Sequence, residues 1–252
     1  NTTNINSAFG YKALTANTFG YVNSAFGYNA LAANTTGSFN SAFGDQTLIA
    51  NTIGAFNNAF GQGALSLNTT GNYNNAFGRL ALRSNTIGNN NNGFGLYSLY
   101  SNVVGANNTA MGHQALYSNT TSNNSAFGYK ALTANTTGGF NSAFGTIALR
   151  YNVIGSKNTA VGFAALQSNT TNNNNAFGYK ALQNNTTGSF NSAFGTTALK
   201  YNTIGSNNTA VGYQSLITNT TGASNIAVGV NSLLSNTSGS QNIAIGVSSL
   251  AL

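Results

Sequence analysis

The side chains that could carry out chemistry are few in this chain and lie far apart. Asp45 is the only acidic residue, His113 is the only histidine, and there is no cysteine. Acid/base catalysis by paired carboxylates, nucleophilic catalysis by a Cys/His pair and metal binding by clustered ligands all need more of these residues. The composition therefore predicts a protein that is not an enzyme and that has no catalytic residues, metal site or cofactor.

The basic residues suggest another kind of site, in which a cation lies beside an aromatic ring. Tyr-Lys pairs occur at residues 11–12, 129–130 and 179–180. Such pairs can stack on and neutralise a nucleic acid or a glycan. Three isolated pairs are more typical of a solvated face, so we expect no nucleic acid partner. The net charge of +7 comes from eight scattered basic residues and favours weak attraction to anionic surfaces.

Asparagine and threonine occur together in a motif that has two interpretations. Asn-Thr-Thr fits the acceptor pattern for N-glycosylation in a secreted eukaryotic protein. In a bacterium or a phage it is turn chemistry only, which we favour. The motif occurs at Asn34, Asn68, Asn119, Asn135, Asn169, Asn185 and Asn219.

Rows of threonine are also how some ice-binding solenoids match a lattice. Here Thr35 and Thr36 are adjacent, so they would point to opposite sides of an extended strand. In other copies Ile53 or Val104 takes the second place. A flat array of threonine is therefore not supported.

These residues belong to a short repeat, typified by NSAFGYKALTANTTG at residues 124–138. Fifteen glycines follow a large apolar residue at a spacing of 17, except for two spacings of 16. A fixed short period of this kind indicates a solenoid. The glycines are Gly10, Gly27, Gly44, Gly61, Gly78, Gly95, Gly112, Gly128, Gly145, Gly162, Gly178, Gly195, Gly212, Gly229 and Gly246.

Two apolar positions in each copy are predicted to form the core. The residue before the glycine is usually Phe, with Met, Val or Ile in some copies, and a Leu recurs four residues after the glycine. Size and apolarity are kept while shape varies, which is typical of buried positions. The predicted core residues are Phe9, Leu14, Phe26, Leu31, Phe43, Leu48, Phe60, Leu65, Phe77, Leu82, Phe94, Leu99, Met111, Leu116, Phe127, Leu132, Phe144, Leu149, Val161, Leu166, Phe177, Leu182, Phe194, Leu199, Val211 and Leu216.

The local pattern favours short strands over helices. Glycine occurs twice in most copies, and no apolar spacing of three and four persists. We predict one strand at Asn-Ser-Ala-Phe and a second around Tyr-Lys-Ala-Leu, with a glycine of positive φ between them and Asn-Thr-x-Gly as the return loop. The expected fold is an all-β parallel β-solenoid of about fifteen coils, each 16–17 residues long. Residues 1–252 would form a single array, a segment of a longer fibre protein.

Two copies are one residue shorter than the others. In these copies the second glycine is replaced, by Ser122 and by Asn172. We expect the turn to change its type there while the strands survive.

Two asparagine positions recur in every copy or nearly every copy. Stacked coils would bring equivalent asparagines above one another, so that their side-chain amides form ladders along the axis. The ladder residues we single out are Asn6, Asn17, Asn23, Asn34, Asn40, Asn51, Asn141, Asn152, Asn191 and Asn202.

A single column of such coils has little apolar material, so we expect further burial against partner chains. Loop aromatics could provide that contact or could pack on their own coil, and both alternatives stay open. These aromatics are Phe39, Phe56, Tyr73, Phe140 and Phe190. No apolar run reaches the roughly 20 residues needed to span a bilayer, so we expect no membrane insertion in this segment.

Asn-Thr-Ala-Val-Gly at 158–162 and 208–212 and Asn-Ile-Ala-Ile-Gly at 242–246 resemble the head repeats of trimeric autotransporter adhesins. The longer NTAVGYQSLITNTTG, residues 208–222, is similar to repeats of viral and phage tail-fibre proteins. The resemblance implies a left-handed parallel β-roll, with three chains side by side in a rigid stalk or head. The adhesin head repeat is shorter, so the loop here is longer.

Together these features predict an extracellular structural fibre or stalk on a cell surface or virion. Its partners would be copies of itself, as a homo-oligomer that is most simply a trimer. One alternative is an adhesin head that binds host-surface glycans or matrix through multiplied weak sites. Another is a subunit that assembles end to end into filaments.

Overall fold

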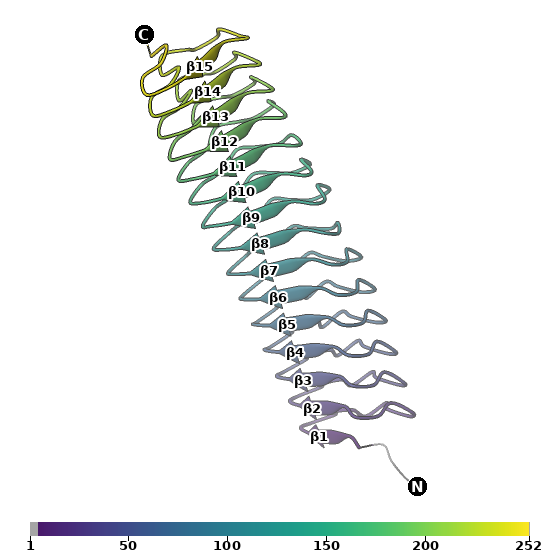
Figure 1. Ribbon diagram of the computed structural model, residues 1–252. Coiled ribbons are helices and arrows are strands. Elements are labelled where there is room, and N and C mark those ends of the chain that lie inside the picture. The colour runs from purple at the N-terminus through teal and green to yellow at the C-terminus, as the bar shows by residue number, and fades with distance from the viewer. Residues whose placement is uncertain (1–4, 252) are drawn as a thin grey trace. The chain divides into compact units, whose positions relative to one another are not determined.

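The computed structural model describes residues 5–251, and every regular element in that range is a short β-strand (Figure 1). The chain divides into two compact units, one ending at Asn124 and the other beginning at Ser125. Each unit is a parallel β-solenoid in which every coil contributes one strand to one sheet. The predicted all-β solenoid of short repeats is therefore confirmed. Its left-handed sense stays a prediction.

The first unit contains seven strands, and each pairs in parallel with the next along the chain. The register joins equivalent residues, as in Ala25 opposite Ala42. The strands are β1 (Ser7–Phe9), β2 (Ser24–Phe26), β3 (Ser41–Phe43), β4 (Asn58–Phe60), β5 (Asn75–Phe77), β6 (Asn92–Phe94) and β7 (Thr109–Met111).

The second unit contains eight strands paired in the same way, with Ala143 opposite Ala160. The strands are β8 (Ser125–Phe127), β9 (Ser142–Phe144), β10 (Thr159–Val161), β11 (Asn175–Phe177), β12 (Ser192–Phe194), β13 (Thr209–Val211), β14 (Ile226–Val228) and β15 (Ile243–Ile245).

A glycine follows each strand, and its backbone takes a conformation that other residues avoid. Gly27 has a φ of +140° and Gly44 a φ of +135°. A Cβ on Gly27 would collide with the carbonyl group of Gly44 in the next coil. The predicted glycine turn after the strand is confirmed, and it limits each strand to three residues.

The second strand predicted around Tyr-Lys-Ala-Leu is wrong. The recurring Leu and the residue two places before it lie in the left-handed region, as in Leu48 with φ +49° and Gln46 with φ +55°. A left-handed residue costs roughly 1–2 kcal/mol and cannot continue a strand. Full burial of a leucine contributes about 1.5–3 kcal/mol, which offsets that cost at Leu48.

The recurring leucines form the apolar centre of each coil, as predicted. Leu14 is 9% exposed, and the equivalent leucines from Leu31 to Leu216 are 0% exposed. They lie beside two columns of small residues, the strand Ala and the Ala, Ser or Thr before the Leu. The confirmed leucines are Leu14, Leu31, Leu48, Leu65, Leu82, Leu99, Leu116, Leu132, Leu149, Leu166, Leu182, Leu199 and Leu216.

The other half of the predicted core is wrong, because the large apolar residue before the glycine lies on the outer face. Side chains alternate along a strand, and the buried middle Ala leaves its two neighbours pointing outward. The exposed residues are Phe9, Phe26, Phe77, Met111, Phe144, Phe177, Phe194 and Val211, and the half-buried ones are Phe43, Phe60, Phe94, Phe127 and Val161.

The interior has no room for these side chains. Gly93 replaces the strand Ala in β6, and a Cβ there would lie 3.0 Å from Ser98 Oγ and 3.4 Å from Leu82 Cγ. Ser98 itself stands where most coils have Ala, and its Oγ donates a hydrogen bond to the Gly95 carbonyl at 3.0 Å. A larger Ser opposite a smaller Gly therefore keeps the local volume nearly constant.

Two buried asparagine ladders hold each coil closed and join it to the next. Within one coil the Nδ2 atoms of Asn40 and Asn51 both donate to the Gly54 carbonyl, at 2.8 and 2.9 Å. Between coils, Asn51 Nδ2 donates to Asn34 Oδ1 at 2.8 Å, and the Asn57 backbone N–H donates to Asn40 Oδ1 at 3.0 Å. The predicted ladder asparagines therefore lie in amide ladders inside the coil.

The two short coils change their turn and keep this arrangement. Where Ser122 replaces the glycine, Asn108 Nδ2 and Asn119 Nδ2 both donate to the Thr121 carbonyl at 2.7 Å. The second short coil uses the Thr171 carbonyl in the same way. As expected, β8 and β11, the strands that follow, keep their three residues.

Candidate interaction surface

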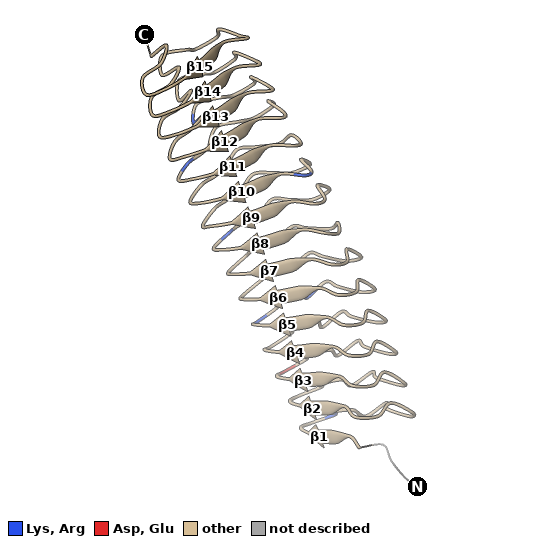
Figure 2. Cartoon of the chain, viewed as in Figure 1, with Lys and Arg blue, Asp and Glu red and all other residues tan. Residues whose placement is uncertain are grey.

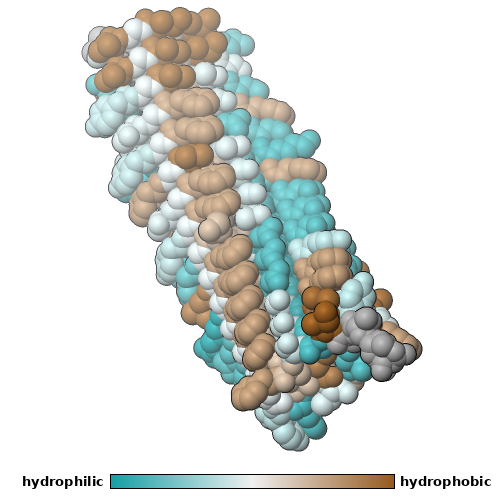
Figure 3. All heavy atoms as spheres, turned by 60° about the horizontal axis from the view of Figure 1, so that its bottom comes forward, coloured by the Kyte–Doolittle hydropathy of each residue, from teal (hydrophilic) through white to brown (hydrophobic). Residues whose placement is uncertain are grey.

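The outward residue at the end of each strand builds an apolar stripe along the sheet face of each unit. Figure 3 shows such a row of apolar side chains with polar rows beside it. The stripe follows from the parallel in-register pairing, which places equivalent residues directly beside each other. The apolar stripe consists of Phe9, Phe26, Phe43, Phe60, Phe77, Phe94 and Met111 in the first unit, and of Phe127, Phe144, Val161, Phe177, Phe194, Val211, Val228 and Ile245 in the second.

The rings of the stripe stack face to face. Ring centroids of Phe43 and Phe60 lie 4.8 Å apart with an interplanar angle of 4°, and those of Phe127 and Phe144 lie 4.7 Å apart at 7°. Phe43, Phe60 and Phe77 therefore each have both faces covered by neighbouring rings. A sugar that stacks on an aromatic face would find no open face at these three rings.

The loop aromatics form a second, shorter apolar row. Phe56 stacks on Phe39 at 4.7 Å and on Tyr73 at 4.9 Å. Phe140 and Phe190 are 63% and 60% exposed. The loop aromatics therefore pack on the neighbouring coils and also keep part of their surface exposed to solvent. Contact of this row with a partner chain stays a prediction.

The basic residues are scattered along the chain, which has a single acid that could pair with them (Figure 2). Six of the eight lie over a tyrosine ring. In the predicted Tyr-Lys pairs the Lys Nζ lies 5.0 to 5.3 Å from the centroid of the tyrosine before it. The two members of each pair are thus in contact with each other.

One such pair also shifts a titration. Lys200 Nζ donates a hydrogen bond to the Tyr201 hydroxyl oxygen at 2.9 Å. This bond and the positive charge of Lys200 lower the pKa of Tyr201 from its ordinary value of 10.0. The tyrosine side chain is exposed, so the effect concerns its ionisation more than the stability of the coil.

The Asn-Thr-Thr motifs do not present their asparagines to solvent. The seven asparagines are 0% exposed, and Asn68 Nδ2 is bonded to Asn51 Oδ1 at 2.8 Å and to the Gly71 carbonyl at 3.0 Å. The acceptor nitrogen of this motif is therefore inside the folded coil. The turn interpretation agrees with this geometry.

The threonine after an asparagine of this motif also bonds to the backbone. Thr35 Oγ1 donates to the Thr52 carbonyl of the next coil at 3.0 Å, and Thr69 Oγ1 donates to the Thr86 carbonyl at 3.1 Å. These hydroxyl groups serve the contact between coils.

The acid and the histidine lie in different coils, Asp45 after β3 and His113 after β7. Asp45 Oδ2 accepts a hydrogen bond from Gln62 Nε2 at 3.4 Å, and His113 packs its ring edge to face with Tyr97. Within residues 5–251 no group of three or more His, Cys, Asp or Glu could hold a metal ion. The same range contains no helix that is long and apolar enough to cross a membrane.

No protein-family model, curated protein sequence or solved structure matches this chain. The apolar stripe, the loop row and the tyrosine-bound cations are therefore interpreted from their own geometry.

Proposed function

We propose that this chain is a structural, non-catalytic element of an extracellular fibre or stalk, in which copies associate side by side through the apolar stripe. The observation that carries the proposal is the outward position of the Phe column. A coil that leaves its largest recurring apolar residue outside has a surface suited to a partner. The likeness of the repeats to adhesin heads and tail fibres supports a cell-surface or virion appendage built as a trimer.

The size of the stripe fits association that adds up coil by coil. Phe26 is 38% and Phe77 is 36% exposed, which corresponds to roughly 75 Å² of open surface on each ring. Five consecutive rings from Phe26 to Phe94 then present roughly 350 Å², within the range of the largest apolar patch on a monomer. A stable interface needs about 800 Å² from each partner. The loop row or more coils must supply the rest.

The covered ring faces favour protein packing over glycan binding along the stripe. An edge-exposed row of rings spaced at 4.7–5.0 Å presents a ridge that a second apolar row can pack against. The surrounding polar rows keep the rest of the coil soluble. The chain would then act through stiffness and reach, and not through a reaction.

Light scattering of the purified full chain tests the proposal. The wild type should have the mass of an oligomer, and the triple variant Phe43→Ser, Phe60→Ser and Phe77→Ser should dissociate while keeping its circular dichroism, because these side chains lie outside the coil. A monomeric wild type overturns the proposal.

The loop row provides the matched control. The double variant Phe56→Ser and Tyr73→Ser removes exposed aromatic surface from the same coils. Dissociation should be weaker in this variant than in the stripe variant. If the loop variant dissociates and the stripe variant stays associated, the stripe is not the interface.

A further inference from the structure

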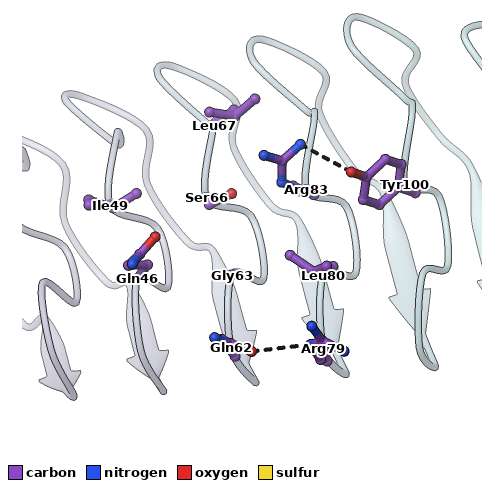
Figure 4. Close-up of a pocket in the computed structure, with 10 residues that line it drawn as sticks. All are labelled: Gln46, Ile49, Gln62, Gly63, Ser66, Leu67, Arg79, Leu80, Arg83 and Tyr100. Carbon is purple, nitrogen blue, oxygen red and sulfur yellow. Dashed lines mark hydrogen bonds between the residues drawn. The ribbon is translucent and has the colours of Figure 1, made fainter.

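One coil of the first unit has smaller residues than its neighbours at two outer positions. Gly63 stands where the adjacent coils have Gln46 and Leu80, and Ser66 stands between Ile49 and an arginine. The result is a hollow of about 380 Å³ in the outer surface (Figure 4). We call it the notch.

Two arginines from the next coil line the notch. Arg79, Leu80 and Arg83 lie along the same coil, with Leu80 between the two arginines (Figure 4). Arg79 Nε donates to Gln62 Oε1 at 3.1 Å, and Arg83 Nη1 donates to the Tyr100 hydroxyl oxygen at 3.1 Å. Each bond uses one of the five N–H groups of a guanidinium and fixes its position.

These cations have no carboxylate partner in the described part of the chain. Asp45 is the only acid of the sequence, and it bonds to Gln62 and not to an arginine. Two guanidinium groups near one hollow outnumber the single carboxylate, which is bonded to Gln62, so the hollow favours an anion. A guanidinium fork binds a carboxylate or sulfate with two parallel hydrogen bonds.

The rest of the lining suits a polar molecule with some apolar surface. Gln46 and Gln62 offer amide groups for hydroxyls, while Ile49, Leu67 and Leu80 offer apolar contacts. The volume of about 380 Å³ lies towards the lower end of the range for ligand sites, roughly 300–1,000 Å³. We propose that the notch binds an acidic sugar unit, with its carboxylate or sulfate group at Arg83 and with Arg79 adding positive charge to the lining. This site does not depend on the association of chains through the apolar stripe.

Saturation-transfer NMR with D-glucuronic acid on the full chain at low salt tests the proposal. Glucuronic acid should bind with a dissociation constant on the order of 1 mM, and D-glucose at least about tenfold more weakly, because it lacks the charged group. Inorganic sulfate should compete with glucuronic acid. Equal binding of the two sugars would overturn the proposal.

Charge variants separate the notch from the general positive field of the chain. Arg83→Gln should weaken glucuronic acid binding about tenfold, whereas Lys157→Gln, which removes the same charge outside the notch, should change it by less than about twofold. Asp45→Asn should strengthen binding, because it removes the negative charge next to Gln62. Equal weakening by both positive-charge variants would mean that no specific site exists.

Filling the hollow tests its shape without changing the charge. Gly63→Asn restores a side chain in a position where Asn29 already adopts a φ of +56°, and only the flexible Leu80 Cδ2 must move. This variant should fold and should lose most of the binding. The control is Ala32→Ile, which enlarges the position equivalent to Ser66 two coils earlier, outside the notch. This variant should leave binding unchanged. Retained affinity in Gly63→Asn would overturn the proposal.

Discussion

Replacing one ladder asparagine tests whether the amide ladders hold the coils together. Asn51 is fully buried, and its Nδ2 donates to the Gly54 carbonyl at 2.9 Å and to Asn34 Oδ1 at 2.8 Å. Its Oδ1 accepts from Asn68 Nδ2 at 2.8 Å. A single side chain therefore makes three hydrogen bonds, one within its coil and two to the coils on either side.

The expected loss follows from counting these bonds. Asn51→Ala removes all three, at about 1 kcal/mol each, so the free energy of unfolding should fall by about 3 kcal/mol. In this variant the Gly54 carbonyl still accepts a hydrogen bond from Asn40 Nδ2, but Asn34 Oδ1 loses the bond that Asn51 Nδ2 donated. Because Ala has no ionisable group, the loss should be the same at all pH values.

Asn51→Asp should instead produce a loss that depends on pH. The new carboxyl would face two acceptors, the Gly54 carbonyl and Asn34 Oδ1, so burial and these acceptors raise its pKa above the unfolded value of about 3.9. A raised folded pKa gives full stability below the unfolded pKa. Stability is then lost as the pH rises from about 4 towards the folded pKa.

Urea unfolding followed by circular dichroism at pH 3.5 and pH 7, at fixed protein concentration, measures both effects. The control is Asn58→Asp at an outward, half-buried position, where Nδ2 makes one bond to Asn75 Oδ1 at 2.8 Å. Its stability should depend much less on pH. The ladder explanation fails if Asn51→Ala costs less than about 1 kcal/mol, or if the two Asp variants respond equally to pH.

Three further perturbations test other parts of the structure. Leu149→Ala empties a fully buried position and should cost about 2–5 kcal/mol in urea unfolding, whereas Phe144→Ser, at a ring that is 40% exposed, should cost about 1 kcal/mol or less in the unassociated chain; equal losses would place the Phe inside. In an ultraviolet titration Tyr201 should ionise below the ordinary pKa of tyrosine, and Lys200→Gln should abolish this shift. Because the folded pKa is lowered, any stability it adds is present at high pH and is lost as the pH falls through the folded pKa. Asn34 should stay unmodified by mass spectrometry when the chain is secreted from a eukaryotic cell, since its amide is buried; a glycan there on folded protein would contradict the ladder.

The period of the sequence was enough to predict the solenoid, the glycine turn, the leucine column and the asparagine ladders. In each case the residue type indicates one environment: glycine a positive φ, leucine the interior, and a recurring asparagine a side-chain hydrogen bond. The orientation of Phe was not predictable from size alone, because an apolar position can face a core or a partner. A usable signal was present in the strand Ala, which is replaced only by Gly93 among the fifteen strands, while the next position varies among Phe, Met, Val and Ile. A strand position that accepts only Ala or Gly must face the closely packed interior.

The left-handed leucines had no comparable signal. Leu has no side-chain hydrogen bond that favours a positive φ, so nothing in its type predicts the conformation seen at Leu48. The conformation comes from closing a coil of 17 residues around a narrow interior. The second strand was predicted wrongly for this reason, since alternating apolar and polar letters describe a strand and this compact turn equally well.

The difference between inward and outward positions of the coil also indicates where specific binding can arise in a repeated array. Inner positions must match from coil to coil, because an altered Ala or Asn disturbs the coils on both sides. Outer positions carry no such restriction, so a departure there changes the surface without changing the fold. Gly63 and Ser66 are departures in two adjacent outer rows of one coil, and Arg79 and Arg83 follow in the next. A repeated scaffold can therefore acquire a local site through two smaller outer residues, while Leu65 and Asn68 of the same coil stay buried in their columns.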